Sequence, residues 1–291
     1  MQQLDIANIE AFVSVAELQS VSDAAKRIGV TQPAISKRIA SLESGLQENL
    51  FNRIGRRIIL TEAGQLILPK CKNILDAISD TKKTLENLSG TVGGILKIGT
   101  SHHIGLHQLP PILRRFTRLY PDVELDIHFM NSEKAYENVQ SGELELAIIT
   151  LPNQIADNLV SRLLWDDPMR IVVAKQHELS KEPNITLQQL TLHNAILPNR
   201  HTYTRNIIEE VFKKNNLSLK TRLSTDYLET IKMMVSVGLG WSILPESLVD
   251  TQLKQLNLEH IKFKRKLGYI QLKNRTLSNA AVAMTSLLKS N

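Results

Sequence analysis

Cysteine is nearly absent from this sequence, since Cys71 is the single one in 291 residues. One cysteine cannot form an internal disulfide, and its isolation excludes a redox switch built from a cysteine pair. Long apolar runs are also missing, because no stretch approaches the roughly 18 residues that a membrane span needs. The opening MQQLDIANIEAF lacks the basic segment, apolar stretch and cleavage site of a secretory signal. We therefore expect a cytoplasmic protein without a membrane partner.

The remaining composition is that of an ordinary soluble protein. Hydrophobic residues make up 42% and charged residues 22% of the chain, and its length suits two or three domains. The formal net charge of +6 permits an anionic partner but does not identify one.

Helical patterns dominate the first 60 residues. Apolar residues recur at spacings of three and four between residues 4 and 18, which predicts an amphipathic helix. A second, short helix is expected to begin with Ser22 as its N-cap and to end at Gly29. A third helix is predicted over residues 31–43, with its proline in the first turn, where no backbone donor is lost.

The third predicted helix has one apolar face and one polar, basic face. Ile35, Ile39 and Leu42 lie at i, i+4 and i+7, whereas Gln32 and its polar neighbours lie on other rows. Two short helices joined by a tight turn are typical of a helix-turn-helix, whose second helix enters the major groove of DNA. Residues 51–60 form two strand-like runs, so we predict a winged helix-turn-helix over residues 1–60.

Basic side chains cluster in this region. Residues 22–60 contain seven lysines and arginines against three acidic residues, a net charge of +4. A solvated charged face is the alternative for each single side chain, but the set favours DNA.

A long helix with a heptad-like pattern is predicted over residues 61–90. Its apolar positions are spaced four and three apart, as in the seam between two helices of a coiled coil. This pattern predicts a dimer, with Cys71 buried in the interface rather than catalytic. The predicted seam consists of Ile67, Cys71, Ile74, Ile78, Thr81, Leu85 and Leu88.

Beyond a glycine-rich break at residues 89–94, strands alternate with helices up to residue 291. This alternation predicts an α/β domain over residues 91–291 with mainly parallel sheets. Ligands bind such sheets at the carboxyl ends of the strands, which directs attention to Thr100, residues 130–132 and Thr150. The predicted strands are residues 95–99, 123–129, 144–150, 169–174 and 195–197.

The stretch from Ser22 to Gly64 strongly resembles the LysR-type transcriptional regulators. The matching segments are Ala24-Ala25, Thr31-Gln32-Pro33-Ala34-Ile35-Ser36, Leu42-Glu43, Leu50-Phe51, Arg53 and Leu60-Thr61-Glu62-Ala63-Gly64. Further support comes from Ser141-Gly142-Glu143-Leu144 and from the segment GLGWSILP at residues 238–245, so the resemblance covers essentially the full chain.

The resemblance implies an effector domain similar to the periplasmic binding proteins. Two α/β lobes would be joined by two crossover strands, with an effector in the cleft between them. The first lobe would comprise about residues 93–165 and 267–291, and the second about residues 166–266. The family also implies a homodimer or a dimer of dimers, a homotetramer, on an inverted-repeat DNA operator, with RNA polymerase as a further partner.

By the same resemblance, the DNA-binding residues divide into two groups. Gln32, Pro33, Ser36 and Lys37 would face base edges and nearby phosphates. Ser22, Thr31, Arg53 and Arg56 would hold the backbone. Arg38 either joins them, lies in solvent or forms an ion pair within the domain.

The effector cleft is expected to contain many hydroxyl groups. With His102 and Arg205 nearby, these groups suggest a small carboxylate or inorganic anion, although Ser and Thr also serve as helix caps. The expected effector-binding residues are Thr100, Ser101, His102, Ser132, Thr150, Thr202, Thr204 and Asp226.

His102, His103 and His107 raise the possibility of a metal site. We expect a structural or exposed role instead, and neither a metal nor a cofactor, because zinc takes about four ligands and this domain has no cysteine. The bases Lys262, Lys264, Arg265 and Lys266 are expected to lie in solvent beside a crossover strand rather than to form a second nucleic-acid patch.

No recognisable nucleophile with its base, acid pair or phosphate loop appears, so we expect a regulator rather than an enzyme. The alternatives are a cytoplasmic small-molecule-binding protein or an enzyme with an accessory DNA-binding domain. A transport-type binding protein does not explain the N-terminal helices, and an architectural DNA binder does not explain the α/β domain.

Overall fold

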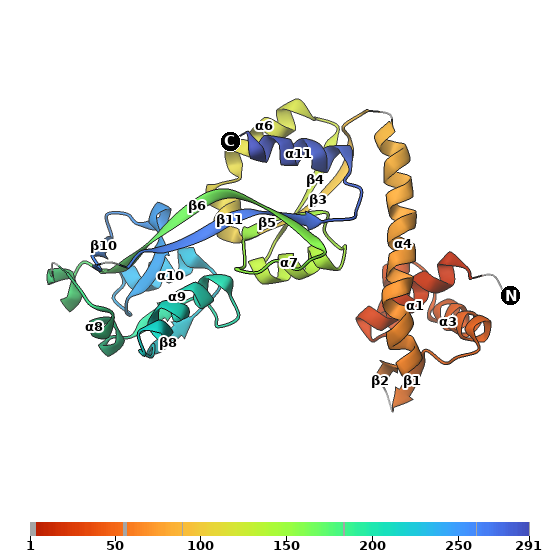
Figure 1. The fold of residues 1–291 in the computed structure, drawn as a ribbon, viewed down its shortest axis with the longest axis horizontal. Coiled ribbons are helices and arrows are strands. Elements are labelled where there is room, and N and C mark those ends of the chain that lie inside the picture. The colour runs from red at the N-terminus through yellow and green to blue at the C-terminus, as the bar shows by residue number, and fades with distance from the viewer. Residues whose placement is uncertain (1–3, 55–56, 89, 183, 260, 291) are drawn as a thin grey trace. The chain divides into compact units, whose positions relative to one another are not determined.

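The computed structural model describes residues 4–54, 57–88, 90–182, 184–259 and 261–290. The chain divides into two compact units, Met1–Leu88 and Ser89–Asn291, whose elements are labelled in Figure 1. In the described part of the chain, no helix combines the length and the apolar character that a bilayer crossing requires.

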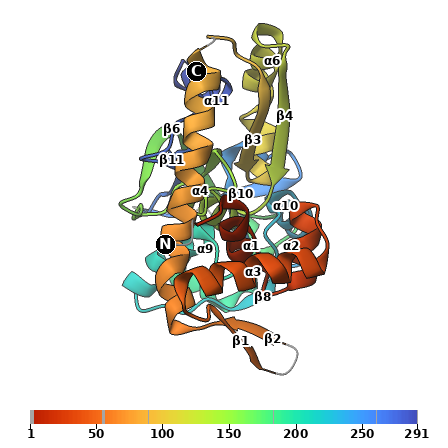
Figure 2. The ribbon, with the colours of Figure 1, turned by 90° about the vertical axis from the view of Figure 1, so that its right-hand side faces the viewer.

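Four helices and a two-stranded wing form the described part of the first unit. The first three helices are α1 (Ile6–Leu18), α2 (Val21–Ile28) and α3 (Gln32–Leu46), and Phe12, Ile35 and Leu42 are at most 2% exposed between them. The antiparallel strands β1 (Phe51–Ile54) and β2 (Arg57–Leu60) form the wing at the start of the long helix α4 (Glu62–Leu88), as Figure 2 shows. This arrangement confirms the predicted winged helix-turn-helix.

The helix-turn-helix begins two residues earlier than the sequence suggested. Ser20, not Ser22, is the N-cap of α2, and its Oγ accepts a hydrogen bond from the amide of Asp23 at 3.1 Å. Gly29 ends the helix as expected, with a positive φ of 76° that glycine adopts without strain. The shift leaves the side chain of Ser22 free to accept a hydrogen bond from Nε2 of Gln32.

Helix α4 packs closely against the wing at its first turn. The hydroxyl of Thr61 accepts a hydrogen bond from the amide of Gly64 at 3.0 Å and donates one to the carbonyl of Asn49 at 2.6 Å. A Cβ at Gly64 would collide with the carbonyl oxygen of Leu50, so only glycine allows this approach.

The predicted seam of α4 is divided between two environments. Cys71 is only 7% exposed and packs against Ile9, Phe12 and Leu42 of its own chain, and Ile67 is half-buried in the same cluster. The chain's own helix α1 already covers Cys71, so its burial does not require a dimer interface. Burial also raises the pKa of its thiol.

Farther along α4, apolar side chains of the same pattern are exposed. Ile74 is 40%, Leu85 64% and Leu88 78% exposed, while Ile78 is half-buried.

The second unit consists of two lobes joined by two long strands. β6 (Leu159–Ala174) and β11 (Phe263–Leu272) pair in antiparallel register from Leu159↔Leu272 to Met169↔Phe263. Figure 1 shows them running from one lobe into the other, which confirms the two crossover strands that the family resemblance implies.

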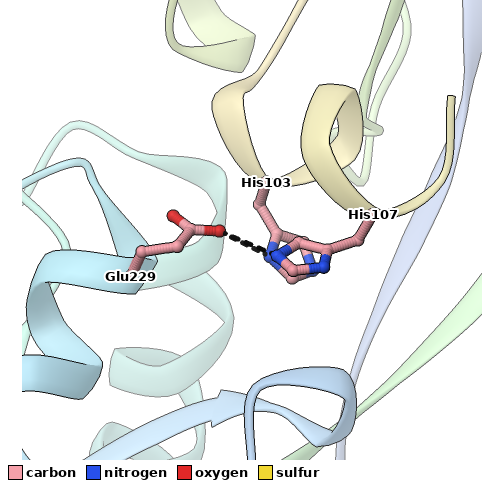
Figure 3. A group of neighbouring side chains, drawn as sticks. All are labelled: His103, His107 and Glu229. Carbon is pink, nitrogen blue, oxygen red and sulfur yellow. Dashed lines mark hydrogen bonds and ion pairs between the residues drawn. The ribbon is translucent and has the colours of Figure 1, made fainter. Parts of the chain in front are cut away.

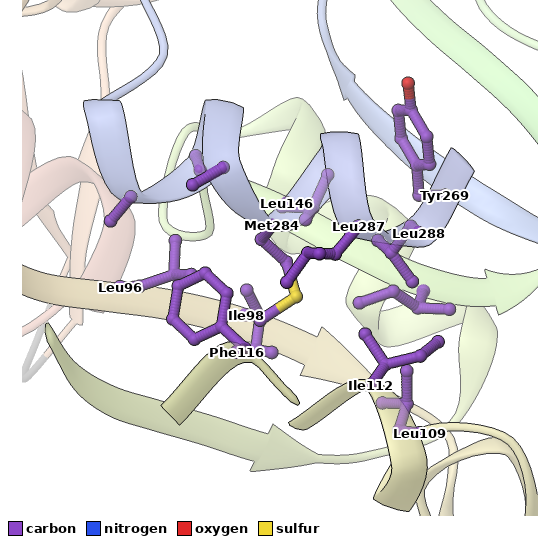
Figure 4. Packing of buried hydrophobic residues seen from close by; sticks show 14 of the residues in the cluster. Leu96, Ile98, Leu109, Ile112, Phe116, Leu146, Tyr269, Met284, Leu287 and Leu288 are labelled. Carbon is purple, nitrogen blue, oxygen red and sulfur yellow. The ribbon is translucent and has the colours of Figure 1, made fainter. Parts of the chain in front are cut away.

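The first lobe carries parallel strands covered by helices. β3 (Gly94–Thr100) lies between its parallel partners β4 (Val123–Phe129) and β5 (Leu146–Thr150). The helices of this lobe are α5 (His102–His107), α6 (Pro110–Leu119), α7 (Ser132–Gln140) and the C-terminal α11 (Asn279–Lys289). Figure 4 shows Met284 and Leu287 of α11 packed over Leu96 and Ile98 of β3.

The second lobe is built on the far halves of the crossover strands. β9 (Ser242–Pro245) and β10 (Leu253–Leu256) pair with β6, and β7 (Ala195–Leu197) pairs with β8 (Thr221–Ser224). The remaining elements are the 3-10 turns Glu178–Lys181 and Glu246–Leu248 and the helices α8 (Leu187–Leu192), α9 (Tyr203–Lys214) and α10 (Leu228–Ser236).

The sheet is mixed, whereas mainly parallel pairing was expected. β11 runs antiparallel to both β5 and β6, and β9 and β10 run antiparallel to β6. The chain returns from the second lobe along β11 beside the strand on which it left the first lobe, and such a return makes the pair antiparallel. The short strand expected at residues 169–174 is the last part of β6, which has 16 residues because it runs from one lobe into the other.

Candidate functional site

Helix α3 presents the polar face that the sequence predicted. Ile35 and Ile39 point into the core at 0% and 8% exposure, whereas Gln32, Pro33 and Lys37 are exposed. Thr31 is exposed as well, and Ser22, Ser36 and Arg38 are half-buried. The strand backbone of Arg53 lies in β1, and Arg56 lies outside the described residues.

The charges around this face differ in how they are neutralised. Lys26 pairs with Asp23 at 3.3 Å, and Arg27 pairs with Glu17 at 2.7 Å. Lys37 forms no ion pair with any residue that the structure describes, so its charge is free for a phosphate or a base.

A cavity of about 310 Å³ lies between the two lobes of the second unit. Both lobes contribute to its lining: Ser101, His102, His103, Phe129, Met130, Asn131, Ser132, Glu133, Thr150, Pro198, Asn199, Thr202, Thr204, Thr225, Asp226, Tyr227, Leu228 and Arg265. Seven of the eight expected effector-binding residues are in this set, namely Ser101, His102, Ser132, Thr150, Thr202, Thr204 and Asp226.

Thr100 is the exception. Its side chain is fully buried, and its hydroxyl donates a hydrogen bond to the carbonyl of Ile148 on the neighbouring strand at 2.9 Å. Thr100 lies outside the cavity although Ser101 lines it, because adjacent residues of an extended chain face opposite sides of the sheet. Thr100 therefore fixes β3 to β5 and does not line the cavity.

The hydroxyl groups of the cavity also organise the backbone. Thr202 is the N-cap of α9, accepting from the amide of Arg205 at 3.2 Å and donating to the carbonyl of Asn199 at 2.8 Å. Ser132 accepts a hydrogen bond from the amide of Thr150 at 3.1 Å. Helix capping and cavity lining therefore coincide at Thr202.

The arginine at the cavity is Arg265, whereas Arg205 was the one expected near it. Arg205 is 2% exposed and points away from the cavity, donating hydrogen bonds to Glu209 at 2.6 Å and to Thr221 at 2.7 Å. Arg265 was expected in solvent, but it is 3% exposed and lines the cavity. Arg265 is buried because its side chain points to the same side of β11 as its apolar neighbours. There it forms an ion pair with Asp167, with Nε 2.8 Å from Oδ2.

Two carboxylates face the cavity. The backbone amide of Tyr203 donates a hydrogen bond to Glu133, which links α9 of one lobe to α7 of the other. Burial raises the pKa of Glu133, although this hydrogen bond and the nearby His201 offset part of the rise. Oδ1 of Asp226 is buried without a hydrogen-bond partner among the residues described, while its Oδ2 lies 3.7 Å from Nε2 of His201.

The histidines of α5 have separate surroundings. His102 packs against Phe129 and Tyr227, with ring centroids 5.4 Å and 4.7 Å away. His103 and His107 both contact Glu229 of α10, as Figure 3 shows. Burial lowers the pKa of His103, and Glu229 opposes that shift in part.

The pKa of Glu229 shifts in the opposite sense to what burial alone would cause. Burial raises it, but the hydrogen bonds from His103 and His107 and from the backbone bring it down to about 2. At neutral pH the cluster therefore contains an ionised carboxylate beside a neutral, buried imidazole.

Sequence reasoning missed Glu133, Arg265 and the contact of Glu229 with the histidines. The range 130–132 ended one residue before Glu133, although the end of β4 had indicated the right place. The burial of Arg265 depends on its contact with Asp167, 98 residues away on the other crossover strand. The contact of Glu229 with His103 joins the two lobes across 126 residues of chain.

Known protein families match both units. Residues 89–291 match the family described as the LysR substrate binding domain, and residues 6–65 match the bacterial regulatory helix-turn-helix proteins of the lysR family. A probable RuBisCO transcriptional regulator of Cyanidium caldarium is 30% identical over 272 residues, which cover 90% of this chain and 86% of that protein.

Solved structures share the fold. A full-length OxyR variant from Pseudomonas aeruginosa has a TM-score of 0.75 at 22% identity, covering 99% of this chain and 96% of that one. The regulatory domain of Synechocystis CcmR, in complex with 2-PG, has a TM-score of 0.62 at 23% identity over 68% of this chain and 96% of that one. This chain thus belongs to the LysR family of DNA-binding transcription regulators, with an N-terminal helix-turn-helix and a C-terminal effector-binding domain.

Proposed function

We propose that this regulator binds a double-stranded operator through α3 and the wing, and that a small molecule between the lobes controls that binding. The observation that carries the proposal is the polar cavity, which both lobes line in a chain that also has a LysR-type helix-turn-helix. A ligand that touches both lobes favours their closed arrangement, and this gives a DNA-binding protein a means of control. A regulator of operators acts where the DNA is, in the cytoplasm.

On the DNA side, the exposed residues of α3 are proposed to read sequence. The amide of Gln32 can form two hydrogen bonds with an adenine, and Lys37 can reach guanine or phosphate. The hydrogen bond from Gln32 to Ser22 holds the Gln32 side chain in one orientation before DNA binds. The proposed contacts are Ser22, Thr31, Gln32, Pro33, Ser36, Lys37, Arg38, Arg53 and Arg56.

The cavity supports a small acid as the effector. The hydroxyls of Ser101 and Thr204, together with Arg265, supply hydrogen-bond donors for a carboxylate or an inorganic anion. Glu133 and Asp226 limit how much negative charge the ligand can carry, because two carboxylates repel it. The buried Oδ1 of Asp226 needs a donor, so we propose an acid that also carries a hydroxyl or ammonium group.

Assembly is proposed to proceed through α4. Ile74, Leu85 and Leu88 leave apolar surface exposed at coiled-coil spacing, and pairing with a second copy would bury it. A dimer, and a dimer of two such dimers, would place two helix-turn-helix units on an inverted repeat. RNA polymerase at the target promoter is the further proposed partner, and no residue is assigned a catalytic role.

Two measurements on the full chain test the proposal. Binding sites are first selected from random double-stranded DNA, and the affinity for the selected site is measured by fluorescence anisotropy. Small acids, amino acids, sugars and inorganic anions are then screened for a rise in melting temperature, since a ligand that binds the native state stabilises it.

Each hit is repeated on Ser101→Ala and Asp226→Asn, with Thr100→Ser as the control that lies outside the cavity. We expect the shift to fall in the first two variants and to persist in the control. A shift that is the same in all three would place the ligand elsewhere, and failure to select any DNA site would contradict operator binding.

A further inference from the structure

Two histidines of the first lobe meet one glutamate of the second. Nδ1 of His103 lies 3.3 Å and Nε2 of His107 lies 3.2 Å from Oε1 of Glu229, and Figure 3 shows the rings converging on that oxygen. The three ligand atoms all lie within 4.8 Å of one another. We propose that this cluster binds a divalent cation of the zinc class and that the bound ion holds the two lobes together.

The spacing of the cluster fits tetrahedral coordination. Nitrogen and oxygen ligands lie about 2.0–2.2 Å from zinc, so that two ligands of a tetrahedral site are about 3.3 Å apart. The two nitrogen-to-oxygen distances are 3.3 Å and 3.2 Å. The two imidazole nitrogens lie within 4.8 Å of each other, so a zinc ion can replace the hydrogen-bonding protons once the two rings draw together.

The donor set is also the right one. Two imidazoles and one carboxylate form the three-ligand set of several zinc sites, with a fourth position left for water or an anion. Borderline ions such as Zn²⁺ prefer imidazole nitrogen, whereas Mg²⁺ and Ca²⁺ prefer sites made of oxygen alone. The proposal therefore concerns first-row transition ions with zinc as the first choice.

A neighbouring hydroxyl positions the buried imidazole. Nε2 of His103 lies 3.5 Å from Oγ of Ser247, so a proton on Nε2 can point to Ser247 and leave the lone pair of Nδ1 for the ion. His103 is 3% exposed, whereas His107 and Glu229 are each 32% exposed. The ion can thus enter from solvent on the side of His107 and Glu229.

The position of the cluster gives the ion a structural consequence. His103 and His107 are four residues apart on α5, and Glu229 lies in the first turn of α10, 122 residues further along the chain than His107. His103 also lines the cavity between the lobes. An ion bound here ties α5 to α10 beside the effector cavity and opposes opening of the lobes.

Zinc titration of the untagged full chain, stripped with a chelator and dialysed, is the test. Competition with a chromophoric chelator measures the number of sites and the affinity, and the melting temperature is recorded in parallel. The key variant is Glu229→Gln, because its amide oxygen still accepts a hydrogen bond from either histidine while the charge that zinc requires is lost. His107→Gln serves as a second variant on a partly exposed position, and His193→Gln, which breaks another histidine–glutamate pair, controls for adventitious binding.

We expect one zinc per chain and a zinc-dependent rise in melting temperature. In Glu229→Gln and His107→Gln the affinity for zinc should fall at least about 100-fold, because the loss of an outer-shell partner alone already costs 10–100-fold. The zinc-dependent rise in melting temperature should shrink with it. His193→Gln should match the parent protein. Absence of a stoichiometric site, or equal affinity in all variants, would overturn the proposal. Neither result bears on DNA selection or effector binding, so the two proposals fail independently.

Discussion

Arg265 and Asp167 face each other across the two strands that connect the lobes. They are direct partners in the antiparallel register of β11 and β6, and their side chains are 3% and 6% exposed. Nη1 of Arg265 also lies 3.3 Å from the hydroxyl of Thr204 at the cavity. The guanidinium of Arg265, which lines the cavity, is therefore held in place by Asp167 of the neighbouring crossover strand β6.

Asp167→Ala should strongly destabilise the second unit. The substitution leaves the buried guanidinium of Arg265 without a counter-charge, which costs about 3–5 kcal/mol in comparable cases. Urea denaturation of the full chain measures the change in the free energy of unfolding. Asp166→Ala is the matched control, because Asp166 is 61% exposed and lies 4.0 Å from Lys264; a loss as large in Asp166→Ala would show that burial is not the cause.

Gln32→Ala should weaken binding to the selected operator and relax the preference for one base pair. A good pair of hydrogen bonds to one base contributes about 1–3 kcal/mol of discrimination. Anisotropy titrations with operators changed at single positions detect this loss. Ser22→Ala should also weaken binding, because it frees Gln32 from its hydrogen bond and removes a proposed contact with the DNA backbone. A uniform loss over all operators would instead indicate a phosphate contact.

Lys37→Ala should lower affinity for specific and random DNA alike. An unpaired lysine that contacts phosphate releases a counterion, so its removal should reduce the slope of log affinity against log salt by about one. Lys82→Ala, on the exposed side of α4, should leave the slope unchanged. If the slope of Lys37→Ala equals that of the parent protein, Lys37 does not contact phosphate.

Glu17→Gln should destabilise the first unit at neutral pH and make its stability less sensitive to acid. Burial raises the pKa of Glu17, but the hydrogen bonds from Lys72 and Arg27 more than offset it and lower the pKa overall. A lowered pKa in the folded state stabilises the fold above the ordinary carboxyl pKa, and this stability is lost as the pH falls through the folded value.

The expected loss at pH 7 is about 1 kcal/mol, because the ion pairs are partly exposed. Thermal unfolding from pH 7 to pH 3 measures it, with Glu10→Gln on the exposed side of the same helix as control. Parallel pH curves for Glu17→Gln and the parent protein would contradict the assignment.

Local patterns predicted the first unit well. The caps, the positive φ of Gly29 and the apolar stripe of α3 act within a few residues, and they fix helices without help from distant parts of the chain. The error at the start of α2 was a choice between two serines two residues apart. At Cys71 the pattern has two readings, because the same helical face that fits a coiled coil also packs against α1.

The second unit was harder because its site depends on contacts between the lobes. One missed feature was nevertheless visible in the sequence. Along β11, Phe263, Arg265 and Leu267 alternate with Lys264 and Lys266, and a period of two places Arg265 on the buried side. The cluster of Glu229 with two histidines had no such local pattern, since it forms only when α10 comes to lie against α5.

The last helix has a consequence for how the protein is made. Ala281, Met284 and Leu288 of α11 complete the core of the first lobe, together with strands synthesised almost 200 residues earlier. The second lobe, by contrast, is assembled from a continuous stretch of chain between β6 and β11. During synthesis from the N-terminus the second lobe can fold first, while the first lobe cannot complete its core until α11 has been synthesised. A frameshift within the codons of α11 would therefore leave the helix-turn-helix and the second lobe in place and open the core of the first lobe.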